Sequence, residues 1–133
     1  MRILSDMRKI GRSVHFAVKG LRHAFRSDKS FRLEVVYGLP AYLTVGWALY
    51  PFAPWEILIY VFSYLFILTI ELVNTAFEKM LDRIHPEDHE LIGKSKDISS
   101  AAVLVAFLFA TAVVVVLTLT RLAQATLVPF PFA

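Results

Sequence analysis

The sequence predicts an all-α membrane protein in which three transmembrane helices follow an N-terminal amphipathic helix. Hydrophobic residues make up 57% of the 133 residues and are concentrated in three uncharged runs, at 35–55, 57–70 and 98–120. A helix needs about 20 apolar residues to cross the hydrocarbon core, and the first and third runs are long enough by themselves. The second run is long enough only if it includes Glu71 and Asn74, so these two residues are expected at membrane depth or at its edge.

The first expected element is an amphipathic helix over about residues 2–26. Apolar side chains recur in it at heptad-like spacing, and the basic residues mostly occupy the other side. This pattern is typical of a helix on a membrane surface with Lys and Arg toward lipid headgroups or the cytosol. A basic face can also indicate nucleic-acid binding, but no aromatic-interleaved platform or nucleic-acid motif accompanies it. No nucleic-acid partner is therefore expected.

Cap residues, prolines and a polar segment mark the boundaries of the remaining elements. Helix-cap residue types at 27–30 separate the surface helix from the first span, and Pro40 is expected to kink that span. Pro51 and Pro54 mark the next turn, and a polar connection over residues 83–95 precedes the third span. We expect one membrane-embedded domain over residues 1–133, with spans at about 31–50, 55–82 and 96–120.

The distribution of basic residues predicts the topology. Nine of the 14 Lys and Arg residues lie in residues 1–33, the turn between the first two spans has none, and residues 79–97 hold four more. The positive-inside rule then places the N-terminus and the 79–97 loop in the cytoplasm. No early apolar core of a signal peptide is present, and the absence of cysteine excludes disulfides and thiolate chemistry.

One polar stripe closes the second apolar run. Glu71, Asn74, Glu78 and Asp82 are spaced by 3, 4 and 4 residues, which at ~100° per residue puts them within roughly 80° of one helix face. Three acids on one stripe repel each other unless a cation or donor lies opposite them. Part of the stripe could be an ordinary solvated helix end. That interpretation fits Glu71 and Asn74 poorly, because the second span is too short without them and because ionisable groups in membranes are usually functional.

Other motifs in the connection give weaker evidence for a function. Gly93-Lys94-Ser95 resembles the end of a P-loop, but position 88 is Asp rather than the required Gly. His85 and His89 have a spacing that is common by chance, and a solvated loop explains them better than a zinc site.

Lys96 and Asp97, at the start of the third span, supply a cation and a further acid for the stripe. Carboxylates, an amide and a lysine at a membrane boundary fit Mg²⁺-dependent phosphoryl transfer, since Mg²⁺ takes carboxylate and phosphate oxygens and a further carboxylate can accept a hydroxyl proton. The residues alone leave two alternatives open, which are a proton-coupled transport subunit and a non-enzymatic assembly factor.

Several motifs resemble the signature of the small prokaryotic diacylglycerol kinases. They are E71-L-V-N74-T-A-F-E78-K-M-L-D82-R-I, H89-E90-L, K96-D97-I-S-S100-A-A-V-L, K19-G-L-R22 and F31-R32-L-E34. The likeness runs from about residue 9 to residue 118. The D-R-I and H-E-L elements look more like the lipid kinase of Gram-negative bacteria than like its undecaprenol kinase relatives.

The resemblance implies a multi-pass homotrimer of the bacterial inner membrane that converts ATP and diacylglycerol to ADP and phosphatidate, with Mg²⁺ as cofactor. Its active sites would lie between subunits at the membrane–cytoplasm boundary. Glu71 would be the general base on the lipid hydroxyl, Asn74 would order that site, and Asp28 and Glu78 would hold Mg²⁺ on ATP. Asp82 would support them.

The resemblance also implies contact residues for the two substrates. Those for the nucleotide are Lys9, Asp28, Glu78, Glu87, Asp88, His89, Lys96 and Asp97. Those for the lipid are Lys9, Arg32, Glu34, Glu71 and Ser100. Three of these positions differ from the family's usual residue: Asp28 stands for Glu, Lys9 for Arg, and Asp88 for an aromatic residue.

Overall fold

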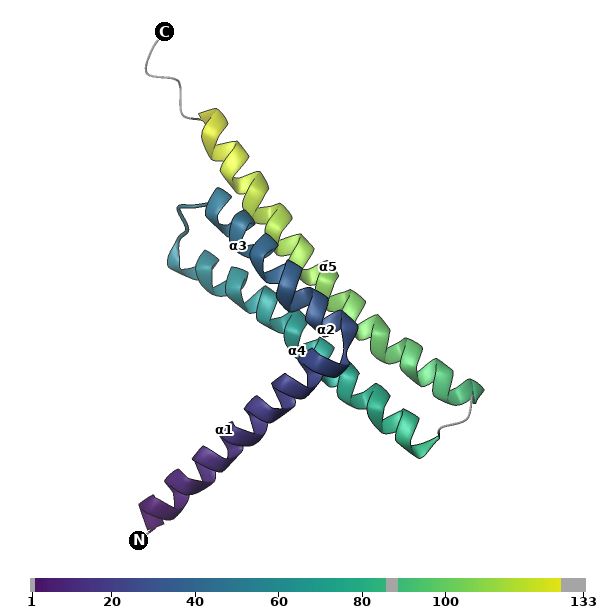
Figure 1. The fold of residues 1–133 in the computed structure, drawn as a ribbon. Helices are drawn as coiled ribbons and strands as arrows, with labels where there is room; N and C mark the ends of the chain where they lie inside the picture. The colour runs from purple at the N-terminus through teal and green to yellow at the C-terminus, as the bar shows by residue number, and fades with distance from the viewer. Residues whose placement is uncertain (1, 86–88, 128–133) are drawn as a thin grey trace.

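The computed structural model describes residues 2–85 and 89–127, and all regular structure in these residues is helical. The helix α1 (Arg2–Ser27) leaves a bundle of three roughly parallel helical segments at a steep angle (Figure 1). The first segment of the bundle consists of α2 (Lys29–Leu33), η1 (Glu34–Gly38) and α3 (Leu39–Ala48). The other two are α4 (Pro54–Ile84) and α5 (Glu90–Leu127).

The break between α1 and α2 occurs where the cap-type residues predicted it. Asp28 has extended backbone angles, and its Oδ1 accepts a hydrogen bond of 2.7 Å from the backbone N–H of Phe31. This is an N-cap, which satisfies an amide that has no partner within the helix. The cap lets the chain turn from α1 into the bundle, and α1 itself confirms the helix expected over residues 2–26.

The first bundle segment is not the single uninterrupted helix expected over 31–50. Residues Glu34–Gly38 form a turn of π-helix, and the N–H of Leu39 donates to the carbonyl of Glu34, five residues earlier. Pro40 follows directly and has no N–H to donate to the carbonyl of Val36. A wider turn before a proline relieves the clash of its ring with that carbonyl, and such π-bulges are frequent at functional sites.

Two helices are long and apolar enough to cross a membrane, Pro54–Ile84 and Glu90–Thr126. They correspond to the second and third expected spans. They pack closely because small residues face the partner helix: Ala106 and Ala110 of α5 are buried against Ile67 of α4. Close approach through small residues is the usual basis of helix packing in membranes.

The connection between α4 and α5 is shorter than the polar loop expected over 83–95. The helix α4 continues to Ile84 and α5 begins at Glu90, so most of the expected loop is helical. The reason lies in local pairing that favours a helix start: Lys94 Nζ is 2.6 Å from Glu90 Oε1, one turn away. His89 Nδ1 accepts from the backbone N–H of Leu91, which adds a side-chain cap.

A buried ion pair closes the end of the bundle farthest from α1. Arg121 of α5 lies 2.6 Å from Glu56 of α4, and their side chains are only 20% and 5% exposed. The same guanidinium donates to the carbonyls of Leu49 and Pro51 at 3.0 and 2.7 Å. Arg121 therefore fastens the α3–α4 turn to α5.

We expect Arg121→Met to lower the melting temperature clearly, because it leaves the Glu56 carboxylate without its cation. Thermal unfolding in detergent measures the loss, and Arg83→Met, at an exposed position on α4, is the matched control. The double variant Arg121→Met/Glu56→Gln should regain part of the stability, since the buried charge is gone. Equal melting temperatures for Arg121→Met and Arg83→Met would contradict this role.

Candidate active site

The polar stripe expected from the sequence lies along the last four turns of α4. Glu71 is 5% exposed, whereas Asn74 and Glu78 are half-buried and Asp82 is exposed. The stripe thus runs from the packed interior of the bundle to its rim. Glu71 is thus shielded from solvent, while Asp82 meets it.

Asn74 and Glu78 are joined within the stripe. Asn74 Nδ2 donates to Glu78 Oε1 at 3.0 Å, which fixes the amide orientation because only the NH₂ side can donate to a carboxylate. Asn74 Oδ1 is buried and has no hydrogen-bond partner in the part of the chain that the structure describes. A buried acceptor without a donor is costly, and it indicates a place where a ligand or a second chain completes the bonding.

Two further acids lie near the stripe, Asp28 at the N-cap of α2 and Glu34 in η1. The carboxylates of Asp28, Glu34 and Glu78 are all close enough to Glu71 to repel its charge. No described Lys, Arg or His makes an ion pair with Glu71. The site is therefore strongly acidic, and it suits a cationic or metal-complexed partner.

The π turn positions Glu34. A Cβ at Gly38 would lie 3.0 Å from Glu34 Oε2, so the glycine leaves room for this carboxylate to lie against the helix backbone. Tyr64 of α4 also holds the turn, because its hydroxyl donates to the backbone carbonyl of Glu34 at 2.8 Å. The wider turn thus fixes the direction of an acidic side chain toward α4.

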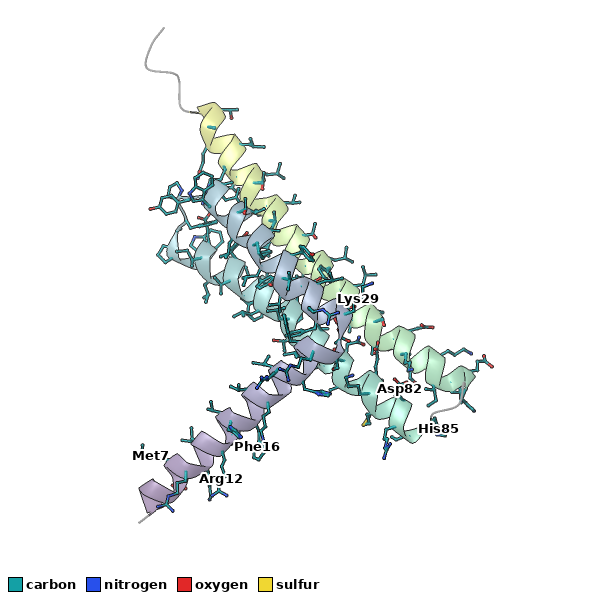
Figure 2. The ribbon with its side chains drawn as sticks, in the orientation of Figure 1. Met7, Arg12, Phe16, Lys29, Asp82 and His85 are labelled. Carbon is teal, nitrogen blue, oxygen red and sulfur yellow. The ribbon has the colours of Figure 1, made fainter. Side chains whose placement is uncertain are left out.

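A cation lies opposite the stripe at its exposed end. Lys96 of α5 forms an ion pair with Asp82 of α4, and the two side chains are 37% and 60% exposed. Figure 2 shows Asp82 on the side of α4 that faces α5, with His85 at the helix end. This meets the sequence-based expectation that Lys96 supplies a counter-charge for the acids.

The other expected site residues are dispersed in one chain. Arg32, Asp97 and Ser100 are exposed, and so is His89 beside the connection. Lys9 lies on α1 near its N-terminal end, in the part that projects away from the bundle between the labelled Met7 and Arg12 (Figure 2). Eighteen helical residues span about 27 Å, so this chain does not bring Lys9 to the stripe. Glu87 and Asp88 lie outside the described residues.

No three His, Asp or Glu side chains among residues 2–85 and 89–127 are grouped closely enough to hold a metal ion by themselves. The donor set still fits one class of cation: carboxylate and amide oxygens without thiolates suit Mg²⁺, which is commonly bound by one or two carboxylates plus phosphate oxygens. Asp28 has one oxygen in the N-cap and the other available, and Glu78 likewise bonds Asn74 through one oxygen.

A pocket that sequence reasoning missed lies between α4 and α5 beside Asn74. Its volume is about 370 Å³, and it is lined mainly by apolar side chains, with Asn74, Ser95 and Ser99 as its polar members. Ser95 and Ser99 are four residues apart on α5, which was a signal for one polar edge on this helix. The pocket is of a size and character that suits part of a lipid at the polar stripe.

Comparison with known proteins gives a consistent set of matches. The family model described as prokaryotic diacylglycerol kinase matches residues 15–118. A diacylglycerol kinase of Escherichia coli (strain K12) is 37% identical over 102 residues, which are 77% of this chain and 82% of the relative. A diacylglycerol kinase of Haemophilus influenzae is 34% identical over 97 residues, covering 71% and 78%. One of Helicobacter pylori (strain 26695) is 28% identical over 104 residues, covering 78% and 80%.

We expect the Asp82–Lys96 pair to contribute little to stability, because exposed ion pairs are worth about 0–1 kcal/mol. Asp82→Asn and Lys96→Gln should each shift thermal unfolding much less than Arg121→Met. If Lys96 serves a phosphate, Lys96→Gln should raise the apparent KM for the phosphate donor while leaving the melting temperature nearly unchanged. A large loss of stability in either variant would instead assign the pair a structural role.

Proposed function

Since the chain belongs to the prokaryotic diacylglycerol kinase family and is a lipid kinase, we propose that it transfers the γ-phosphoryl group of ATP to diacylglycerol. The products would be phosphatidate and ADP. The observation that carries the proposal is the burial of Glu71 at the inner end of a stripe whose other end meets solvent. Such a stripe can serve an apolar lipid and a water-soluble nucleotide on one helix.

Glu71 is the proposed general base. The O–H of the lipid would lose its proton to a carboxylate oxygen of Glu71 while the alcohol oxygen attacks the γ-phosphorus and the bond to ADP breaks. A base for this alcohol must lie where the lipid headgroup can reach it, and Glu71 lies in the packed part of the bundle, shielded from solvent. Asp28, Glu34 and Glu78 place further negative charge around this carboxylate.

Asn74 and Glu78 are the next members of the proposed site. The bond from Asn74 Nδ2 leaves one oxygen of Glu78 for another partner, and it fixes the unpartnered Asn74 Oδ1 in one direction. Asn74 would thus orient the groups between the lipid and nucleotide ends.

Asp28 and Glu78 would hold Mg²⁺ together with the nucleotide. The ion, when bound, would neutralise charge on the phosphate oxygens. Both carboxylates lie near Glu71 although they come from different bundle segments. Asp82 would support this end of the site through its pair with Lys96.

The remaining roles divide by position along the stripe. At the exposed end, Lys96 would contact phosphate oxygens as a compact cation. At the buried end, Glu34 would border the lipid. The further proposed nucleotide contacts are Lys9, Glu87, Asp88, His89 and Asp97, and the further proposed lipid contacts are Lys9, Arg32 and Ser100.

We also propose that the working form is a homotrimer with three spans per subunit in a bacterial inner membrane, with the N-terminus and the 79–97 loop cytoplasmic. Two observations support an assembly. The site of one chain leaves Asn74 Oδ1 unsatisfied, and α1 carries Lys9 away from the stripe of its own chain. A neighbouring subunit can bring its own Lys9 to the stripe and a donor to Asn74 Oδ1.

Purified protein in detergent, supplied with ATP, Mg²⁺ and a lipid, tests the proposed reaction. Diacylglycerol should be phosphorylated much faster than undecaprenol, and omission of Mg²⁺ should abolish product formation. Undecaprenol phosphorylation alone would overturn the substrate assignment in favour of the related polyprenol activity. Absence of ATP consumption with either lipid would overturn the phosphoryl-transfer reaction itself.

Glu71→Gln and Glu78→Gln separate the two central acids. They are seven residues apart and so about 10 Å apart along the helix. Glu71→Gln keeps the size of the side chain but removes the proton acceptor, so kcat should fall about 10²–10⁴-fold while Mg²⁺ and ATP still bind. Glu78→Gln should weaken nucleotide binding, and added Mg²⁺ should restore part of it.

Nucleotide titrations at several Mg²⁺ concentrations, with turnover measured in the same detergent, check both variants. Glu90→Gln, at an exposed acid paired with Lys94, is the matched control for loss of one negative charge. Near-normal turnover of Glu71→Gln would remove it as the base. A Mg²⁺-dependent binding defect in Glu71→Gln but not in Glu78→Gln would reverse the two roles.

A further inference from the structure

A second cavity lies where α1 crosses α4. Its volume is about 580 Å³, and small residues of α1, namely Ala17, Gly20 and Ala24, form one wall. The other wall is on α4 and includes Leu72, Thr75 and Lys79. A Cβ at Gly20 would meet no atom within 4 Å, so the groove is open on the α1 side.

This groove is on a different face of α4 from the polar stripe. At ~100° per residue, the four α4 residues that line it, at positions 72, 75, 76 and 79, centre roughly 110° around the helix from the stripe. Ligands in the two places would therefore contact different sides of α4. The groove is not part of the candidate kinase site.

Thr75 has an unusual environment in this groove. It is 4% exposed, and its Oγ1 has no hydrogen-bond partner in the described part of the chain. Thr69, Thr118 and Thr120 show the ordinary arrangement, because each donates to the carbonyl four residues earlier at 2.8 Å. A buried hydroxyl outside this pattern indicates a missing partner for Thr75.

One lysine and one histidine are among the residues that line the groove. Lys79 is one turn after Thr75 on the same face of α4, and His23 of α1 lines the groove opposite it. Neither side chain makes a hydrogen bond or an ion pair with residues 2–85 or 89–127. Here the apolar part of α4 gives way to charged residues, so the Lys79 ammonium stands at the edge of an apolar zone.

We propose that the groove binds one anionic phospholipid. Its apolar walls would take part of an acyl chain, and the Lys79 ammonium and His23 imidazole would contact the phosphate. Rotation of the Thr75 side chain about χ1 would turn its buried hydroxyl toward an ester or phosphate oxygen. The occupant is a lipid rather than free phosphate because most of the lining is apolar. It is anionic rather than neutral because the polar groups at the groove's end are an ammonium and an imidazole beside a basic helix.

The test measures lipid binding to the purified full-length protein by native mass spectrometry in detergent, without ATP, so its outcome is independent of the proposed reaction. Dioleoyl phosphatidylglycerol should bind more tightly than dioleoyl phosphatidylcholine. Lys79→Gln should weaken phosphatidylglycerol binding about tenfold, the value of one charge-assisted contact. Lys94→Gln, at a lysine outside the groove, should bind as the wild type does.

Gly20→Leu provides a second, steric arm, because the new side chain would fill open space in the groove. Gly11→Leu is its matched control, since Gly11 is also on α1 and a Cβ added there would also meet no atom within 4 Å. Gly20→Leu should remove the preference for phosphatidylglycerol, and Gly11→Leu should keep it. Thr75→Val, which is nearly isosteric, should weaken binding and raise the melting temperature in lipid-free detergent.

Four results would overturn the proposal. They are equal binding of phosphatidylglycerol and phosphatidylcholine, unchanged binding in Lys79→Gln, displacement of the lipid by millimolar inorganic phosphate, and tighter binding of diacylglycerol than of phosphatidylglycerol. A change of oligomeric state in Gly20→Leu, with lipid binding unaltered, would instead assign the groove to a second copy of the chain. If Gly20→Leu does not fold, Lys79→Gln and Lys94→Gln still decide the question.

Discussion

A carboxylate placed in an apolar helix bundle needs compensation for the water it loses, and α4 carries two such groups. Glu56 and Glu71 are buried to nearly the same extent on one helix. Glu56 has a guanidinium at 2.6 Å and a backbone N–H from Ala53 at 2.7 Å. Among the described residues Glu71 has neither, and three other carboxylates repel it. The same constraint is thus satisfied at one end of the helix and left unsatisfied at the other, as expected where binding or catalysis must supply the missing partner.

The sequence was sufficient for the features that depend on spacing along one helix. The polar stripe, the Asp28 cap and the two long apolar helices are all local patterns, and the structure contains each of them. The π turn before Pro40 was outside the reach of such patterns. The sequence indicated a kink at the proline, but it did not indicate that the preceding turn would widen to relieve the clash.

Contacts between distant segments were the main features that the sequence could not predict. Arg121 was the only basic residue after the third apolar run, and Glu56 interrupted two uncharged runs, but nothing in their spacing joined positions 65 residues apart. The same applies to the approach of Asp28 to Glu71. The family resemblance assigned Asp28 to the site, but no periodicity joined the two positions. The groove between α1 and α4 depends on the angle at which α1 leaves the bundle. The periodicity of a helical sequence gives no information on that angle.

The two ends of the bundle therefore differ in how completely one chain satisfies its own polar groups. At the Arg121 end, one guanidinium bonds two carbonyls and a buried acid, so the α3–α4 turn and α5 are held without outside help. At the Glu71 end, Asn74 Oδ1 and Thr75 Oγ1 are consecutive buried groups without partners in the described structure. They face toward different sides of α4, because successive helical residues are about 100° apart. The stripe and the groove at α1 are thus two separate places where a ligand or a second chain would satisfy a buried polar group.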